Sequence, residues 1–227
     1  MDRPFVYVNM AMTVDGKITS SMRERPRFTS EHDRRHMDRL RAAADGIMLG
    51  ARTMRADNPA WHVRSAAMRD YRESLGKPEG LLRVLVTAGG EIDCESRFFD
   101  ESHGGGERII ATVEDVPRDR LAALESRAEI WQIGRGRVDL PELLRRLGGR
   151  GVERLLVEGG GELNWALVCA DLVDELHVTI APVLLGGQAA PTLLEGGGFP
   201  MKMRRRLRLE ELTREGDELF CRYVVER

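Results

Sequence analysis

The stretch VEGGGELNW, residues 157–165, decides the fold that this sequence predicts. It follows an apolar segment and places an acid and three glycines before residues that favour a helix. Glycine has no Cβ, so its backbone adopts positive φ at little cost and approaches other groups closely. A helix start also presents unpaired N–H groups and a partial positive charge. Strand, glycines and helix together indicate an α/β unit, with either an anion cradle or a tight turn that holds no ligand.

The composition narrows the class of protein. With 227 residues, 42% hydrophobic and 32% charged, the chain is long enough for one large globular domain or two small ones. The net charge is −2, and the only basic block is residues 203–206, so we expect no nucleic-acid partner. The three cysteines lie far apart and form no CxxC, which predicts neither a metal site nor a disulfide framework. No apolar run reaches membrane-spanning length, so we expect no membrane partner and a cytoplasmic location.

Strand and helix patterns alternate along most of the chain. Residues 5–12, 46–50, 81–87, 108–112, 129–133, 154–157 and 175–181 resemble strands, and residues 30–44, 117–126, 140–147 and 162–170 resemble helices. A hairpin pattern of residues 206–213 and 218–225 follows, around a Glu-Gly-Asp turn. This order predicts an α/β fold: a mainly parallel twisted sheet flanked by helices, with a C-terminal antiparallel hairpin. Residues 64–79 are expected to form a surface loop, and residues 1–227 a single domain.

The segments that follow the predicted strands are rich in glycine, hydroxyl and carboxylate groups. Four of five such junctions contain glycine: TVDGK (13–17), AGG (88–90), EGGGELN (158–164) and the segment that ends in LLGG (184–187). The fifth, ARTMRADNP (51–59), has a threonine and an aspartate. Open α/β sheets bind ligands at the carboxyl ends of their strands. The pattern therefore predicts a site for a large polar ligand that carries phosphates.

Several familiar motifs are absent. No GxGxxG follows the first strand, which disfavours a standard dinucleotide-binding domain, and no Walker A loop is present. The chain also lacks the GxSxG of serine hydrolases and the H-x-E…P-C-x-x-C signature of zinc deaminases.

The junction segments resemble the pyrimidine reductases of riboflavin biosynthesis, which have a dihydrofolate-reductase-like fold. The segments that carry the resemblance are NMAMTVDGK (9–17), GIMLGARTMRADNP (46–59), LLVEGGGELNW (155–165), LVDELHVTIAP (172–182) and LLGGQAAPT (184–192). The segment IGRGRVDLPELL (133–144) also fits. The resemblance runs from about residue 5 to residue 200. It is greatest to the stand-alone 2,5-diamino-6-ribosylamino-4(3H)-pyrimidinone 5′-phosphate reductase type.

The resemblance implies an activity and its partners. Members transfer a hydride from NADPH to C1′ of a ribosylaminopyrimidine 5′-phosphate, after its sugar has opened to an imine, and so form the ribitylamino chain. A homodimer is also implied. Such chemistry needs positioning and exclusion of water but no covalent nucleophile, and the sequence shows no nucleophile-and-base arrangement. The resemblance does not settle whether the substrate is the diaminopyrimidinone or its deaminated uracil form.

The family's site residues can be carried over onto matching positions. The cofactor-binding set is Ala11, Thr53, Asp57, Thr87, Ala88, Gly89, Gly159, Gly160, Gly161, Glu162, Leu163, Asn164, Gly186 and Gly187. The substrate-binding set is Arg41, Trp61, Arg64 and Glu158. The reduction also needs a proton donor, for which Glu158, Asp57, Lys17 and a bound water are all candidates. No metal is implied.

Simpler roles remain open for each of these residues. Thr53 and Asp57 fit a helix start and a turn, Glu158 a polar cap, and Arg41 a solvated helix face. Two other functions also remain open: reduction of another pteridine or imine substrate on the same fold, and a non-catalytic nucleotide-binding module.

Overall fold

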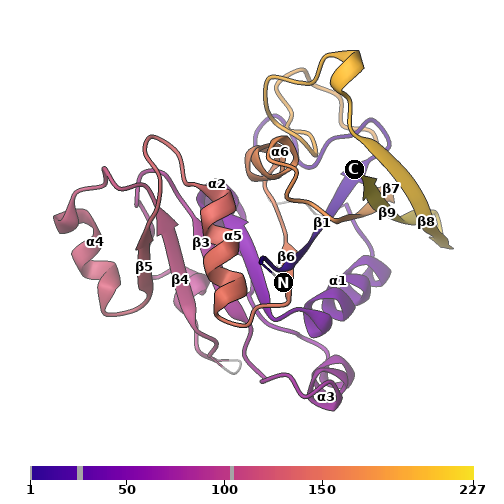
Figure 1. Ribbon diagram of the computed structural model, residues 1–227. Coiled ribbons are helices and arrows are strands. Elements are labelled where there is room, and N and C mark those ends of the chain that lie inside the picture. The colour runs from indigo at the N-terminus through magenta and orange to yellow at the C-terminus, as the bar shows by residue number, and fades with distance from the viewer. Residues whose placement is uncertain (1, 25–27, 103–104) are drawn as a thin grey trace. The chain divides into compact units, whose positions relative to one another are not determined.

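The computed structural model describes residues 2–24, 28–102 and 105–227, and it divides the chain into two compact units (Figure 1). The first unit is formed by Met1–Phe5 and Asp38–Leu156, and the second by Val6–Met37 and Val157–Arg227. Each unit thus combines segments that lie far apart in the sequence. The expectation of a single domain over the whole chain stays a prediction.

The first unit has strands in the order β5-β4-β3-β2-β6, of which β2, β3, β4 and β5 pair in parallel. Its strands are β2 (Gly46–Gly50), β3 (Leu82–Val86), β4 (Arg108–Thr112), β5 (Glu129–Gln132) and β6 (Arg154–Val157). Consecutive core residues such as Ile109 and Ile110 are both 0% exposed, although they point to opposite faces. Burial on both faces explains why these strands are nearly continuous apolar runs.

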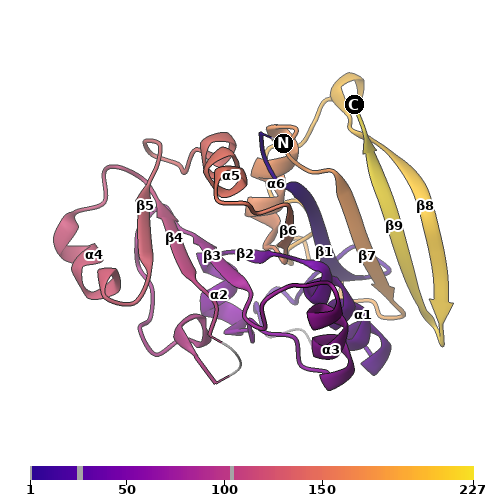
Figure 2. The same cartoon turned by 60° about the horizontal axis from the view of Figure 1, so that its bottom comes forward.

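Helices cover this sheet on both sides. α5 (Leu140–Gly149) lies on one face, whereas α2 (Ala51–Asp57) lies on the other (Figure 2). α4 (Arg118–Glu125) lies beside the outer strand β5. The start of α5 is fixed by Asp139, whose carboxylate accepts a hydrogen bond from the Glu142 N–H at 3.0 Å.

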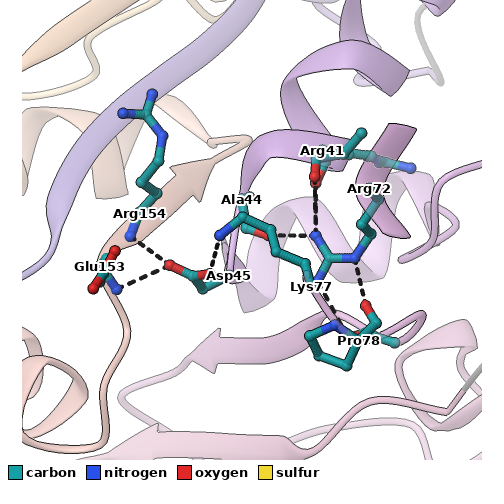
Figure 3. A network of polar contacts seen from close by, with 10 residues as sticks. Arg41, Ala44, Asp45, Arg72, Lys77, Pro78, Glu153 and Arg154 are labelled. Atoms are coloured by element: carbon teal, nitrogen blue, oxygen red, sulfur yellow. Dashed lines mark hydrogen bonds and ion pairs between the residues drawn. The ribbon is translucent and has the colours of Figure 1, made fainter. Parts of the chain in front are cut away.

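The prediction of a surface loop at residues 64–79 is wrong, because α3 (Ala66–Ser74) lies there. The buried residue of α3 is Arg72, which is 1% exposed. Its guanidinium donates to the carbonyl oxygens of Ala44 and Pro78 (2.6 Å), as Figure 3 shows. It also donates to the Ala42 carbonyl at 3.2 Å. A helix that buries a charge instead of a leucine has no apolar stripe, and periodicity therefore failed to detect it.

Asp45 connects the segment before β2 to the start of β6 within the same unit (Figure 3). Its carboxylate forms an ion pair with Lys77 and accepts from the N–H groups of Glu153 (2.9 Å) and Arg154 (2.8 Å). Burial alone would raise the pKa of Asp45, but these donors outweigh it and hold that pKa below its ordinary value.

The second unit has four strands in the order β1-β7-β9-β8. β1 (Phe5–Thr13) and β7 (Glu175–Ala181) are parallel, with Asn9 opposite His177 and Ala11 opposite Thr179. β9 (Glu218–Glu226) runs antiparallel to β7, and β8 (Arg206–Glu215) forms a hairpin with β9. The predicted α/β class, with mainly parallel strands and an antiparallel C-terminal hairpin, is confirmed.

Two helices pack on opposite faces of β1 and β7 (Figure 2). The first residues of α1 (Glu31–Ala43) lie on the face of His177, since the ring of His36 is 5.8 Å from that of His177 and 5.3 Å from that of Phe220. The turn before α6 (Gly161–Cys169) lies on the other face, next to Met10.

Candidate active site

The glycine turn of the opening stretch leads from β6 into α6. Gly159 has φ +90°, and a Cβ on it would lie 2.8 Å from the sulfur of Met10. The Gly159–Gly160 peptide is cis, and Gly160 is the N-cap of α6 with no side-chain cap. A Cβ on Gly161 would lie 2.6 Å from the Thr192 carbonyl oxygen. Packing therefore requires glycine at two of the three positions, and the first turn of α6 receives no side-chain cap from Gly160.

The first turn of α6 is attached to residues 192–195. The Gly161 carbonyl accepts from the Glu195 N–H at 3.0 Å, and the Asn164 amide donates to the Leu193 carbonyl at 3.1 Å. Asn164 is 1% exposed, and its Oδ1 is buried with no hydrogen-bond partner among the described residues. Leu163 is buried and Glu162 is exposed. A buried, unsatisfied acceptor beside the helix start is a polar group that a ligand can satisfy.

The segments after β1 and β7 are joined by Asp15. Its carboxylate accepts from the Thr13 hydroxyl at 2.6 Å and from the N–H groups of Leu185 (3.1 Å) and Gly186 (2.6 Å). These bonds lower the pKa of Asp15 to about 2. The other residues of this region are Ala11, half-buried in β1; Lys17, whose Nζ donates to the Ala190 carbonyl at 3.2 Å; and Gly187, which is exposed.

Glu158 lies directly after β6 and is half-buried. Its carboxylate is close enough to Asp33 of α1 to disfavour charge there. Asp33 is a residue that the sequence analysis missed, because an acid in the first turn of a helix normally favours the helix dipole. Glu218 on β9 was missed as well. It is 5% exposed and accepts from the Ser30 N–H at 2.8 Å.

Thr53 and Asp57 both lie on α2 in the first unit. They are four residues apart, so they share one side of the helix, and both are half-buried. α2 ends at Asn58, which has the left-handed φ of 39° and accepts a hydrogen bond from the Arg97 N–H at 2.8 Å. This ending fixes the position of Asp57 at the last helical residue.

Thr87, Ala88 and Gly89 form the turn after β3. Thr87 is buried, and its hydroxyl accepts from the Gly90 N–H at 3.2 Å. Ala88 and Gly89 are exposed, and the Gly89 carbonyl accepts from Arg120 at 3.1 Å. The turn therefore offers exposed backbone above a buried hydroxyl.

The predicted substrate residues of the first unit differ in exposure. Arg41 is 1% exposed and donates to the His62 carbonyl at 2.9 Å. Trp61 is also 1% exposed, and its ring packs edge-on against Phe98 at 5.2 Å. Arg64 is exposed, and its N–H donates to the buried Asp38 carboxylate at 3.3 Å. Arg64 is therefore the one of these three whose side chain reaches solvent, whereas Arg41 supports the backbone that leads to it.

The structure thus gathers the predicted residues into two sets, one in each unit. The first unit holds Arg41, Thr53, Asp57, Trp61, Arg64, Thr87, Ala88 and Gly89. The second unit holds Ala11, Lys17, Glu158, Gly159, Gly160, Gly161, Glu162, Leu163, Asn164, Gly186 and Gly187. Their roles toward a ligand stay predictions. In the part of the chain that the structure describes, no three His, Cys, Asp or Glu residues are placed to hold a metal ion. No helix in the same ranges is long and apolar enough to cross a membrane.

Comparisons with known proteins place the chain in a family. Residues 4–220 match the model of the RibD C-terminal domain. A 2,5-diamino-6-ribosylamino-4(3H)-pyrimidinone 5′-phosphate reductase of Archaeoglobus fulgidus is 36% identical over 95% of this chain and 95% of its own length. The protein of that name from Methanothermobacter thermautotrophicus is 36% identical over 98% and 99%.

The fold agrees with this assignment. A pyrimidine reductase-like protein of Corynebacterium diphtheriae has a solved structure that superimposes with a TM-score of 0.84, at 24% identity, over 99% of this chain and 92% of that one. The long match to the family model and the full-length relatives lead to one conclusion. This chain belongs to the RibD C-terminal domain family.

Proposed function

We propose that the protein reduces the ribosylamino side chain of an aminopyrimidine 5′-phosphate to the ribitylamino form, with NADPH as the hydride donor. The observation that carries this proposal is the full-length similarity to reductases of that name, together with the glycine turn and Glu158 at the end of β6. Of the two substrate forms, the diaminopyrimidinone is favoured, because the relatives that match over their full length carry it in their names.

The residues present fit a dinucleotide. Helix α6 starts at glycines with no side-chain cap, and such a helix start suits a phosphate. The buried Oδ1 of Asn164 accepts no hydrogen bond from the described residues, so a donor group of the cofactor can bind it. Thr53, Asp57 and the exposed turn at Ala88 and Gly89 are the cofactor residues that we assign to the first unit. NADPH, when bound, supplies the hydride.

The protein's own groups position the substrate and manage its charge. Arg64 is an exposed residue, and the planar fork of an arginine suits a 5′-phosphate. Glu158 accepts hydrogen bonds from ribityl hydroxyls or ring amines of the substrate. Asp15 and Lys17 hold the segments after β1 and β7 in place through backbone groups. Glu158 and the segments that Asp15 and Lys17 hold are the second unit's contribution to orienting C1′ for reduction.

An activity assay on purified protein tests the proposal. NADPH oxidation should depend on the ribosylamino diaminopyrimidinone phosphate and be slower with its deaminated uracil analogue. Glu158→Gln should lower kcat by about 100-fold and leave the Kd for NADPH within about threefold. Thr53→Ala with Asp57→Ala should instead raise that Kd by about tenfold or more. Cofactor binding without turnover on either pyrimidine would contradict the proposal and favour a nucleotide-binding module.

A homodimer and a cytoplasmic location are parts of the same proposal. The apolar residues Leu184 and Leu185, which are 73% and 42% exposed, support association with a second copy. The free cysteines Cys94, Cys169 and Cys221 fit a reducing compartment.

A further inference from the structure

Two arginines from different helices bind the backbone of the turn after β3. Arg120, in α4, donates from Nη1 to the Gly89 carbonyl at 3.1 Å. Arg55, in α2, donates from Nη1 to the Glu91 carbonyl at 3.3 Å. Both guanidinium groups are thus held beside the same short turn, residues 89–91, and all of these residues belong to the first unit.

The turn is packed on one side and open on the other. A Cβ on Gly90 would lie 2.9 Å from a methyl carbon of Val116 and 3.1 Å from one of Leu121, so the turn contacts the start of α4 directly. Gly89 is exposed, and among the described residues a Cβ on it would have open space around it. A ligand can therefore approach the backbone of Gly89 between the two arginines' contacts.

Each arginine keeps hydrogen-bond donors for a ligand. Within the described ranges, both side chains make their hydrogen bonds through Nη1, and the Nη1 of Arg120 also lies 3.7 Å from the carboxylate of the exposed Glu91. An exposed ion pair of this length contributes little to stability. A phosphate can replace Glu91 as the partner of Arg120, because it carries more charge and its oxygens match the planar fork of the guanidinium.

The position and the chemistry of the turn fit one group of the cofactor. The turn follows the carboxyl end of a parallel strand, where α/β sheets bind ligands, and in nucleotide-binding folds of this class a nearby arginine accommodates the 2′-phosphate of NADPH. The uncapped start of α6, in the second unit, suits the pyrophosphate. The 2′-phosphate is the remaining phosphate of the cofactor, and NADH has a hydroxyl in its place.

We propose that Arg120 and Arg55 bind the 2′-phosphate of NADPH and thereby make the enzyme prefer NADPH to NADH. This proposal rests on the function proposed above and adds to it the residues that select the cofactor. Arg120 is the main contact because its carbonyl partner, Gly89, lies on the open side of the turn. Arg55 adds a second positive charge from α2, whereas the carboxylate of Glu91 opposes the phosphate.

Equilibrium binding of the two cofactors compares Arg120→Ala with Arg118→Ala. Arg118 is the matched control, since it is exposed and lies two residues earlier in α4, where it does not share a side of the helix with Arg120. Arg120→Ala should raise the Kd for NADPH by about tenfold or more and leave the Kd for NADH within about threefold. Arg118→Ala should leave both within about threefold. Arg120→Lys should keep part of the preference, because the charge stays and the planar fork is lost.

Two further variants test the second arginine and the acid. Arg55→Ala should raise the Kd for NADPH by about threefold or more, whereas Glu91→Gln should lower it, because a negative charge beside the phosphate is removed. Neither should change the Kd for NADH by more than about threefold. Equal losses of affinity for NADPH and NADH in Arg120→Ala would show that the arginine only supports the turn, and would overturn the proposal.

A second measurement needs no turnover. Calorimetry on the unaltered protein should show that adenosine 2′,5′-bisphosphate binds about tenfold or more tightly than adenosine 5′-monophosphate, and Arg120→Ala should abolish the difference. Equal binding of the two nucleotides, in a protein that reduces the pyrimidine, would overturn the arginine site and leave the proposed function standing. An arginine-dependent preference for the bisphosphate, in a protein that reduces neither pyrimidine, would support the site and contradict the proposed function.

Discussion

At the scale of single residues, Arg72 shows how much structure one buried side chain can hold. α1 ends at Ala43, and its last carbonyl groups have no partner within the helix. The Arg72 guanidinium donates to the carbonyl oxygens of Arg41, Ala42 and Ala44, so a cation from α3 satisfies the negative end of α1 (Figure 3).

Loss of this cation should lower the free energy of unfolding. Arg72→Met should reduce the free energy of unfolding by about 3 kcal/mol or more, since it leaves several buried carbonyl groups without donors. Arg55→Met is the matched control, because Arg55 is exposed and donates one long hydrogen bond of 3.3 Å to Glu91. The control should change stability by about 0.5 kcal/mol or less. Urea unfolding checks both, and equal effects would contradict the role given to Arg72.

The lowered pKa of Asp15 predicts that the stability of the folded protein depends on pH. Its pKa lies at about 2 instead of 3.8, so the charged form is favoured in the folded protein. The stabilisation from this carboxylate is fully present above about pH 4 and disappears as pH falls toward about 2. Asp15→Asn should therefore be less stable than the parent protein at about pH 7, and the difference should shrink at about pH 3. A difference of the same size at both pH values would exclude the carboxylate charge as its cause.

At the scale of elements, the hydrophobic pattern of the sequence predicted those strands whose bounds are set by the burial of apolar side chains. β2, β4, β6 and β7 begin and end where the sequence analysis put them, because buried parallel strands are apolar runs bounded by polar residues. α2 and α3 escaped. The first is short, and the second buries an arginine rather than an apolar stripe.

The residues of the candidate site were likewise predictable where the signal is local in the sequence. The glycine turn was visible because successive glycines weaken both helices and strands, and they therefore favour a turn. Asp33 was not visible, because its partner Thr179 lies far along the chain and only the pairing of strands brings the two together. Residue types are local information, whereas a carboxyl's neighbours are set by the fold.

The start of α6 gives a prediction for an element. Gly161→Ala places a methyl group 2.6 Å from the Thr192 carbonyl oxygen, so residues 192–195 must move away from the helix start. We expect NADPH binding to weaken by about tenfold or more and thermal stability to fall. Gly149→Ala is the control, since that helical glycine of α5 has open space around its missing Cβ. It should be neutral or stabilise by up to about 1 kcal/mol. NADPH titration and thermal unfolding distinguish the two variants.

At the scale of the whole molecule, β8 is an exposed strand with apolar side chains. Leu207, Leu209 and Leu212 are 43%, 49% and 56% exposed, and among the described strands β8 pairs with β9 alone. The unpaired backbone groups of an edge strand can pair with a strand of another chain.

This surface predicts the oligomeric state. The parent protein should have twice the 25.5 kDa mass of the chain in solution, and Leu209→Lys with Leu212→Lys should give the single mass. Leu75→Lys alters an equally exposed leucine, 45% exposed, in the other unit and should leave the mass unchanged. Light scattering after size-exclusion chromatography measures all three. A double variant that keeps the parent's mass would exclude β8 as the interface.

The bond between Glu218 and Ser30 has a consequence for synthesis. It joins positions 188 residues apart, and β9, which carries Glu218, is the last strand of the chain. On the ribosome, the segment that contains Asp33 cannot form this bond until residue 218 has emerged. The uninterrupted stretch Asp38–Leu156 is complete much earlier. A nascent chain stalled before residue 218 should therefore resist protease in that middle stretch while the segment that precedes Asp38 is still digested.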